Sequence, residues 1–383
     1  MNMGDSSNAL EYIRNLAEQD QAKKPSFSDL MEYMDAKARR EGIPLGGQFE
    51  LTPLCNFDCK MCYTHLTKEQ IGDRSLLSTE QWKQIIHDAW NAGMMSANLT
   101  GGECLTYPGF KELYLYLREL GCEIIVLSNG SLLDEQWIDF FRKHKPRMIQ
   151  ITLYGGDRET YLRVTGKDEF ERVVSHIRAA ADAKLPVALT ITPNKYMAEG
   201  AFQTIKLAKE LGIYYNINGF LTNPKEETGR SGQNHDLPIE KYAEILAYRN
   251  RLEGIETLPI SPGKLPPPGG PHHEWKGCGL DCKAGQSCFT VEWDGKLYAC
   301  GSIRDIWAEP LRTGFVNAWN HVRNEALRYP AVPECIECPY RTVCTNCAAI
   351  KTQYAEKGKQ PILLCKQTQF LVQQGVKRMP DCY

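Results

Sequence analysis

Long apolar runs are missing from this sequence, and so is an export signal. The first residues, MNMGDSSNALEYIRN, contain no basic segment followed by an apolar one. No stretch approaches the roughly 18 apolar residues that cross a bilayer. We therefore expect a soluble, cytoplasmic protein that does not insert into a membrane.

Blocks of basic residues are also absent. The 383 residues include 45 Lys and Arg against 47 Asp and Glu, which gives a formal net charge of −2. Proteins that bind nucleic acid or an anionic membrane surface usually carry a basic patch. The sequence therefore predicts neither of these partners.

Cysteine, by contrast, is abundant and clustered. Of 15 cysteines, three lie at 55–62 and nine lie between 278 and 365. The reducing cytosol disfavours disulfides, so clustered cysteines there indicate metal or iron–sulfur ligation. Buried structural thiols are the alternative, and we expect that role for the isolated Cys122.

Alternating apolar runs and helical patterns predict the fold. Residues 1–46 are expected to form a helical lead-in, and residues 47–252 to contain six β/α units. Six units are fewer than the eight of a closed TIM barrel. We therefore predict an α/β fold with a parallel sheet, a partial (β/α)6 barrel. Its strands are expected at 47–54, 96–100, 123–128, 148–154, 187–192 and 214–221.

The composition changes after the predicted barrel. Residues 253–277 are expected to form a Pro/Gly-rich linker, in which His272 and His273 are exposed loop residues rather than metal ligands. Residues 278–383 carry ten cysteines and few apolar periodic patterns. This cysteine-rich domain has a thin core, so we expect it to need bound clusters to hold its shape.

The first cysteine group follows directly on the first predicted strand. Cys55, Cys59 and Cys62 have the spacing C-x3-C-x2-C and are expected at the C-terminal mouth of the barrel. A [4Fe–4S] cluster takes four thiolates, so three leave one iron open for a substrate or cofactor. A zinc site completed by His65 is the alternative, but the loop lacks the second ligand pair typical of zinc.

The segment CNFDCKMCY, residues 55–63, resembles the signature of the radical S-adenosylmethionine (SAM) superfamily. The resemblance implies that the three cysteines are catalytic: they hold a cluster whose open iron binds SAM, and an electron cleaves the S–C5′ bond. The resulting 5′-deoxyadenosyl radical abstracts a substrate hydrogen. The family usually has an aromatic residue before the third cysteine. Here Met61 holds that position, and Tyr63, just after Cys62, is the candidate adenine contact.

Further motifs at the strand ends resemble the SAM-binding elements of the same family. Gly101 and Gly102 of LTGGE would let the backbone approach closely, and Glu103 would accept hydrogen bonds from the SAM ammonium. The remaining predicted contacts are ribose contacts from Ser128 and Asn129, and a polar pair for ribose and carboxylate formed by Thr152 and Arg163.

The C-terminal cysteines resemble a SPASM domain, an extension of many radical SAM enzymes that modify peptides. WDGKLYAC, residues 293–300, predicts a hairpin that turns at Gly295 and leads into Cys300. A zinc knuckle would use only the two C-x2-C units of 335–347. The resemblance implies two auxiliary [4Fe–4S] clusters, three clusters in all. We assign Cys282, Cys288, Cys300 and Cys347 to the first, and Cys335, Cys338, Cys344 and Cys365 to the second.

Two details of this assignment stay open. Cys278 could replace Cys282, and Cys347 follows Cys344 after two residues where the domain has three. Of the cysteines left over, Cys104 and Cys382 are candidate hydrogen-atom donors to a substrate radical, as in peptide epimerases. Incidental thiols are the alternative for both.

The sequence therefore predicts a radical SAM/SPASM enzyme that crosslinks, oxidises or epimerises a ribosomally made peptide. The 46 residues before the barrel are too few for a leader-binding domain, so a separate leader-binding protein is a possible partner. The expected electron donor is a flavodoxin or ferredoxin. Sulfatase maturation is disfavoured, because those enzymes place an aspartate after the hairpin cysteine and Gly301 stands here.

Two other functions fit parts of the sequence. A dehydrogenase of the same chemistry would act on a small molecule, with Tyr154, Asp157 or Glu103 as candidate bases. A non-enzymatic iron–sulfur electron-transfer protein is the second alternative, but an electron carrier gains nothing from an open iron.

Overall fold

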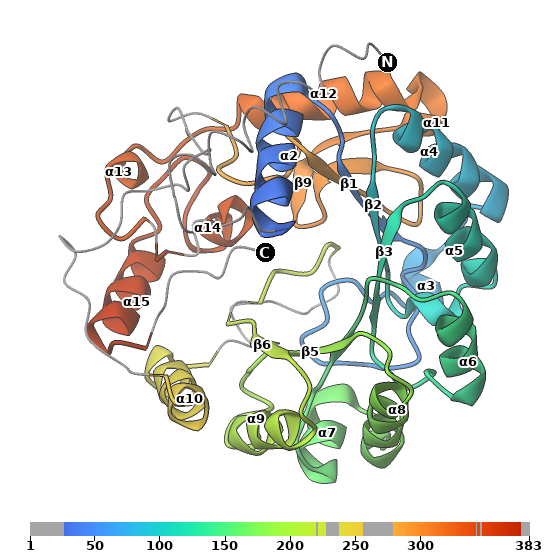
Figure 1. The fold of residues 1–383 in the computed structure, drawn as a ribbon. Coiled ribbons are helices and arrows are strands. Elements are labelled where there is room, and N and C mark those ends of the chain that lie inside the picture. Colours follow the sequence, from blue (N-terminus) through green and yellow to red (C-terminus); the bar gives the residue numbers. More distant parts are fainter. Residues whose placement is uncertain are drawn as a thin grey trace, which may run out of the picture.

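The computed structural model describes residues 27–219, 221–226, 237–255, 279–341, 343–344 and 347–376. Its centre is one sheet of nine strands in the order β6-β5-β4-β3-β2-β1-β7-β8-β9. The sheet is curved and carries helices on its outer side (Figure 1). The six predicted barrel strands are confirmed as β1 Gly46–Glu50, β2 Ser96–Thr100, β3 Glu123–Ser128, β4 Met148–Thr152, β5 Val187–Ile191 and β6 Tyr215–Ile217, all parallel.

Helices alternate with these strands as the sequence predicts. Helix α4 begins at a capping box formed by Ser78 and Gln81, and buries Trp82, Ile85 and Ala89 on one face. The helices from the lead-in to the end of the barrel are α2 Phe27–Glu41, α3 Lys68–Ile71, α4 Thr79–Asn91, η2 Cys104–Thr106, α5 Phe110–Glu119, α6 Glu135–Lys143, α7 Arg158–Thr165, α8 Phe170–Asp182, α9 Gly200–Glu210 and α10 Ile239–Leu252.

The cysteine-rich segment extends the barrel sheet rather than starting a new one. Strand β7 Cys288–Val291 pairs in parallel with β1, in a register that sets Gly46 opposite Cys288. The predicted hairpin is confirmed, because β8 Leu297–Cys300 returns antiparallel to β7 around Gly295, whose φ is +88°. Strand β9 Ile303–Ala308 completes the sheet, followed by α11 Pro310–Thr313, α12 Phe315–Leu327, α13 Pro333–Ile336, α14 Ala348–Tyr354 and α15 Ile362–Gln373.

One hydrophobic core spans the barrel and this extension. Phe49 of β1 packs edge-on against Trp82 at 6.0 Å and against Phe289 of β7 at 5.9 Å. The lead-in helix α2 and the turn after it lie against α12, where Trp319 donates a hydrogen bond to the carbonyl of Gly42 at 2.6 Å (Figure 1). The first part of the described chain is therefore packed against the helix that follows the cysteine hairpin.

Some sequence predictions fall outside the described residues. Most of the predicted linker at 253–277 lies there, with His272 and His273, and so do Cys278 and Cys382. The predicted domain boundaries stay predictions. Across the described ranges, no helix is both long and apolar enough to cross a membrane.

Candidate active site

The three-cysteine loop leaves the C-terminal end of β1, at the mouth of the curved sheet. Cys59 is buried, and Cys55 and Cys62 are half-buried. Backbone N–H groups donate to two of the thiols: Phe57 to Sγ of Cys55 at 3.4 Å, and His65 to Sγ of Cys62 at 3.2 Å. Such N–H···S contacts suit thiolate ligands, because they stabilise negative charge on sulfur.

The last turn of α7 holds the backbone of the three-cysteine loop. Asp58 donates its N–H to the carbonyl of Thr165, and Lys60 donates to the carbonyl of Val164, each at 3.1 Å. These carbonyls are the ones that a helix end leaves without a helical partner. The end of α7 therefore fixes the backbone between Cys55 and Cys62.

Burial raises the pKa of the Cys55 thiol to about 12. A thiol in such a place ionises when a metal ion coordinates it. Within the described ranges, no three His, Cys, Asp or Glu side chains converge as a single metal ion would require. The zinc alternative with His65, whose ring nitrogen lies 3.6 Å from the Asp58 carboxylate, therefore gains no support.

The GGE turn after β2 lies against the segment that leads into Cys55. Gly102 donates to the carbonyl of Thr52 at 2.6 Å, and Glu103 donates its N–H to the carbonyl of Leu54 at 2.9 Å. A Cβ on Gly102 would lie 2.2 Å from the Leu54 oxygen. Glycine is therefore required here by the chain's own backbone, in addition to any role toward SAM.

Glu103 connects the ends of β2 and β3. Its side chain is fully buried, and its carboxylate accepts hydrogen bonds from Oγ of Ser128 at 3.0 Å, from N–H of Asn129 at 2.8 Å and from N–H of Leu105 at 3.1 Å. Burial raises the pKa of this carboxyl, and the same hydrogen bonds oppose the rise. Hydrogen-bond donors of the protein itself thus already contact the Glu103 carboxylate. Its contact with the SAM ammonium stays a prediction.

Asn129 connects this arrangement to the three-cysteine loop. Its Nδ2 donates to Oδ1 of Asn56 at 2.9 Å and lies 3.7 Å from Sγ of Cys55. Its Oδ1 accepts from Oγ of Ser131 at 2.6 Å, and Asn56 donates in turn to Ser131 at 2.7 Å. Asn56 and Ser131 were missed by sequence reasoning, although each stands next to a motif residue.

The other predicted SAM contacts lie apart from this network. Thr152 ends β4 opposite Thr190 of β5. Arg163 donates to the carbonyl of Tyr196 at 2.7 Å and to Oγ1 of Thr160 at 3.2 Å. Among the described residues no hydrogen bond joins Thr152 to Arg163, and their pairing on SAM stays a prediction.

The Cys104 thiol does not open onto the mouth of the sheet. The residue is fully buried, and its Sγ donates to the carbonyl of Leu127 at 3.2 Å. This burial gives no support to its predicted role as a hydrogen-atom donor to a substrate, because a donor must reach the substrate radical.

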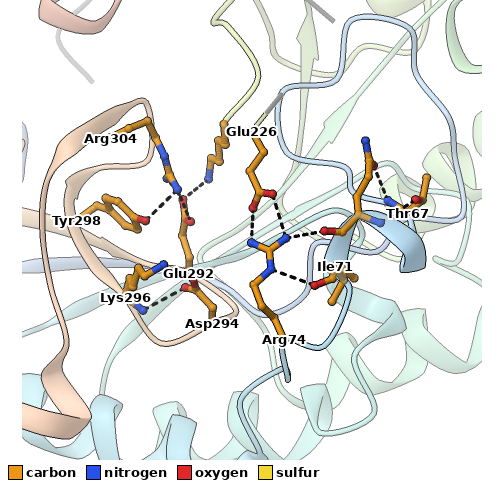
Figure 2. A network of polar contacts seen from close by, with 11 residues as sticks. Thr67, Ile71, Arg74, Glu226, Glu292, Asp294, Lys296, Tyr298 and Arg304 are labelled. Atoms are coloured by element: carbon orange, nitrogen blue, oxygen red, sulfur yellow. Dashed lines mark hydrogen bonds and ion pairs between the residues drawn. The ribbon is translucent and has the colours of Figure 1, made fainter. Parts of the chain in front are cut away.

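A buried charge network lies beside the loop and was not predicted. Lys225 forms ion pairs with Glu50, the last residue of β1, and at 2.9 Å with Glu292 of the hairpin. Glu292 also pairs with Arg304, which donates to the Tyr298 hydroxyl at 2.9 Å (Figure 2). The Lys225 N–H donates to the carbonyl of Tyr63 at 2.9 Å.

This network joins three regions that are distant in sequence. Burial opposes the charge on Lys225, but the carboxylates of Glu50 and Glu292 raise its pKa. The next residue, Glu226, pairs with Arg74 at 2.7 Å (Figure 2). The segment after β6 is therefore fixed to the three-cysteine loop and to the hairpin. A Cβ on Gly301 would lie 3.2 Å from both Glu50 and Lys225, so the network fills the space beside this glycine.

The family model of the radical SAM superfamily matches residues 49–196. A probable GTP 3′,8-cyclase of Saccharolobus islandicus is 34% identical over 218 residues, which cover 56% of this chain and 69% of the cyclase. The chain belongs to the radical SAM superfamily.

Further comparisons extend the similarity beyond the barrel. The radical SAM chain is 25% identical to the AdoMet-dependent heme synthase of Methanosarcina barkeri, over 81% of its own length and 92% of the synthase. Its fold is similar to that of Streptococcus suis SuiB bound to S-adenosylmethionine, with a TM-score of 0.63, 14% identity and coverage of 92% and 86%. It is also similar to anSMEcpe with bound AdoMet, with a TM-score of 0.63, 19% identity and coverage of 85% and 96%.

These comparisons confirm the predicted α/β partial barrel. Membership also makes the chain an enzyme and implies a [4Fe–4S] cluster and SAM as cofactors. The non-enzymatic alternative is therefore wrong. The three thiols of Cys55, Cys59 and Cys62, with two backbone N–H donors to sulfur, fit such a cluster.

The C-terminal cysteines form two groups in this radical SAM enzyme. Cys335, Cys338, Cys344 and Cys365 line a single pocket between α13 and α15. Lys351 and Arg341 line the same pocket and add positive charge to it. All four predicted ligands of the second auxiliary cluster thus face one space, which fits a cluster bound by four thiolates.

The other group is more deeply buried. Burial raises the pKa of Cys282 to about 12, and nearby Cys300 and Cys347 add to the rise. Cys288 begins β7, where its Sγ would lie 3.1 Å from a Cβ placed on Gly46. The charged residues near it include Lys283, Asp35 and Arg39. Cys282, Cys300 and Cys347 are therefore neighbours, and the place of Cys288 in their cluster stays a prediction.

Proposed function

We propose that this radical SAM enzyme modifies a peptide, and that Cys55, Cys59 and Cys62 hold its SAM-binding cluster. The observation that carries the proposal is the combination of this loop with a C-terminal region whose cysteines line a second site. When bound, the cluster and SAM supply abstraction of a hydrogen atom from a substrate carbon. The fold neighbours SuiB and anSMEcpe were each crystallised with a peptide, which supports a substrate of this class.

The residues around the loop would hold the cofactors in place. Asn129 and Asn56 would fix Cys55, while Glu103 would hold the strand ends at which Ser128 and Asn129 meet SAM. Gly101, Gly102, Tyr63, Thr152 and Arg163 are the further candidate contacts. Neighbouring residues that hydrogen-bond to the groups holding a cofactor orient those groups and limit their motion.

The C-terminal cysteines would hold two auxiliary [4Fe–4S] clusters as assigned from the sequence. Crosslinking and oxidation remove electrons from a substrate, so each needs an acceptor, which auxiliary clusters can provide. Epimerisation needs a thiol donor instead, and the burial of Cys104 argues against that residue. Crosslinking or oxidation, for which auxiliary clusters would provide the acceptor, is the reaction class we favour, with reductant from a flavodoxin or ferredoxin. Cys382 lies outside the described residues and stays a predicted donor.

A small-molecule substrate is the second candidate, since relatives in sequence are named a heme synthase and probable GTP cyclases. Of its candidate bases, Asp157 caps α7 and accepts from Thr160 at 2.8 Å, and Glu103 is buried. Tyr154 is half-buried, and the buried surroundings of its hydroxyl raise its pKa well above the usual value. None of the three is a strong base exposed at the mouth.

The test compares substrate classes on anaerobically reconstituted protein with SAM and dithionite. The precursor peptide SuiA, the Cp18Cys peptide, GTP and an iron porphyrin are added separately, and 5′-deoxyadenosine and product masses are measured. We expect a peptide to increase 5′-deoxyadenosine formation several-fold. The mass of the peptide product should be lower than that of the substrate by the mass of the hydrogen atoms removed. Stimulation by GTP or the porphyrin alone would favour the second candidate.

A further inference from the structure

Tyr161 of α7 has a hydroxyl without a hydrogen-bond partner. The side chain is fully buried, and its oxygen makes no hydrogen bond to any of the described residues. A buried polar group without a partner is rare in native proteins and needs an explanation. Tyr114, the other tyrosine among the largest fully buried side chains, donates its hydroxyl to the carbonyl of His144 at 2.5 Å.

The ring of Tyr161 lies under the three-cysteine loop. It packs edge-on against Phe57, which stands between Cys55 and Cys59, with ring centres 6.1 Å apart. The carbonyls of Val164 and Thr165, one turn further along the same helix, accept the N–H groups of Lys60 and Asp58. The helix that carries Tyr161 is therefore the one that fixes the loop backbone.

Besides burial, four ionisable groups raise the pKa of the Tyr161 hydroxyl, and two of them are cysteines of the cluster loop. Cys59 raises its pKa most after burial, followed by Glu169 and Cys55. Glu169 is also held by Arg172 at 3.2 Å. Glu103, the other carboxylate that raises this pKa, already accepts hydrogen bonds from Ser128, Asn129 and Leu105, which leaves the sulfur ligands and Glu169 as candidate acceptors.

We propose that the hydroxyl of Tyr161 donates a hydrogen bond to a sulfur atom of the cluster held by Cys55, Cys59 and Cys62, and so raises its reduction potential. The proposal rests on the proposed function, because it requires that cluster. Reduction adds one negative charge, which an O–H dipole directed at sulfur stabilises. Tyr161 is a positioning and tuning residue here, and it does not touch the substrate.

The experiment compares Tyr161→Phe with the matched control Tyr114→Phe in the full-length, reconstituted protein. Phenylalanine keeps the ring and its contact with Phe57, so folding is preserved. Reduced clusters are followed by electron paramagnetic resonance during a redox titration. The SAM-binding cluster is recognised as the one whose signal changes when SAM is added.

At the potential that half-reduces this cluster in the wild type, we expect Tyr161→Phe to lower its reduced-to-oxidised ratio about tenfold. For a one-electron couple this equals a shift of about 59 mV to lower potential. The auxiliary clusters should keep their potentials, and Tyr114→Phe should change none of the three. The iron content should match the wild type in both variants.

Two outcomes would overturn the proposal while leaving the proposed function intact. An unchanged potential in Tyr161→Phe, with the SAM-responsive signal present, would mean that the hydroxyl serves another acceptor such as Glu169. An equal shift in all three clusters would mean a general change of environment. A wild-type protein without any SAM-responsive signal would contradict the proposed function, and this inference with it.

Discussion

The two cysteine regions of this enzyme are built on different kinds of support. The three-cysteine loop rests on a large core, and the twelve largest fully buried side chains of the described chain all lie at or before Trp319. The second C-terminal group, at residues 335–365, lies among three helices of four, seven and twelve residues. We therefore expect the barrel to fold by apolar packing, and the last segment to depend on the proposed cluster.

The first auxiliary group lies between these extremes. Cys288 and Cys300 belong to strands that extend the barrel sheet, so the core of β1 supports them. The charge network of Glu50, Lys225 and Glu292 joins this hairpin to the three-cysteine loop. Support therefore decreases stepwise from the barrel to the end of the chain, and the following predictions test this gradient.

Removal of iron should have the largest effect, and it should be confined to the last segment. We expect residues 333–376 of the apoprotein to be cleaved by trypsin at least tenfold faster than in the reconstituted protein, because few buried apolar groups hold them. The barrel should resist equally in both. Mass spectrometry of the fragments gives the result, and equal protection of the last segment in both forms would refute the gradient.

Truncation of a buried side chain should affect the stability of the two regions differently. Trp82→Ala should cost about 3–5 kcal/mol of unfolding free energy with or without iron, because its side chain is fully buried in the barrel. Leu364→Ala, buried between the cysteines of the last segment, should show its cost only in the reconstituted protein. Anaerobic urea denaturation measures both. A similar loss for Leu364→Ala in the apoprotein would mean that the segment folds alone.

Loss of the lysine that connects the regions should cost about 3 kcal/mol. Lys225→Met leaves the buried carboxylates of Glu50 and Glu292 without their shared cation. The control is Lys241→Met, a half-buried lysine of α10 that pairs with the exposed carboxylates of Glu199 and Glu244. Urea midpoints compare the two variants, and a loss no greater than that of the control would show that the network does not connect the regions.

The smallest effect is expected at Ser131, which supports Asn56 and Asn129 beside the loop. Ser131→Ala removes two side-chain hydrogen bonds, at 2.6 and 2.7 Å, and should cost about 1 kcal/mol. Ser175→Ala, on the outer face of α8, removes one exposed hydrogen bond and is the control. Thermal unfolding of both proteins provides the comparison. Equal melting temperatures would mean that water replaces the Ser131 contacts.

The features that sequence reasoning predicted well are local ones. The β/α alternation, the hairpin at Gly295 and the placement of each motif at a strand end depend on residues close together in the chain. The resemblance to a SPASM domain also grouped Cys335, Cys338, Cys344 and Cys365, which line one cavity. Short-range patterns determine such elements directly.

The features that it missed depend on pairing between distant residues. The parallel pairing of β7 with β1 and the ion pair of Lys225 with Glu50 leave no periodic trace in the sequence. Glu103 and Arg163 were predicted as ligand contacts from their motifs. In the structure, however, Glu103 accepts a hydrogen bond from Asn129, and Arg163 donates one to the carbonyl of Tyr196. Which partner a polar side chain takes depends on three-dimensional packing.

The central claim is that Cys55, Cys59 and Cys62 hold the cluster that cleaves SAM. The most direct measurement is 5′-deoxyadenosine and iron per chain in the reconstituted wild type and in the variant with all three changed to alanine. We predict about twelve irons and 5′-deoxyadenosine for the wild type, against about eight irons and no product for the variant. Product formation by the variant, or zinc in place of iron in the wild type, would contradict the account.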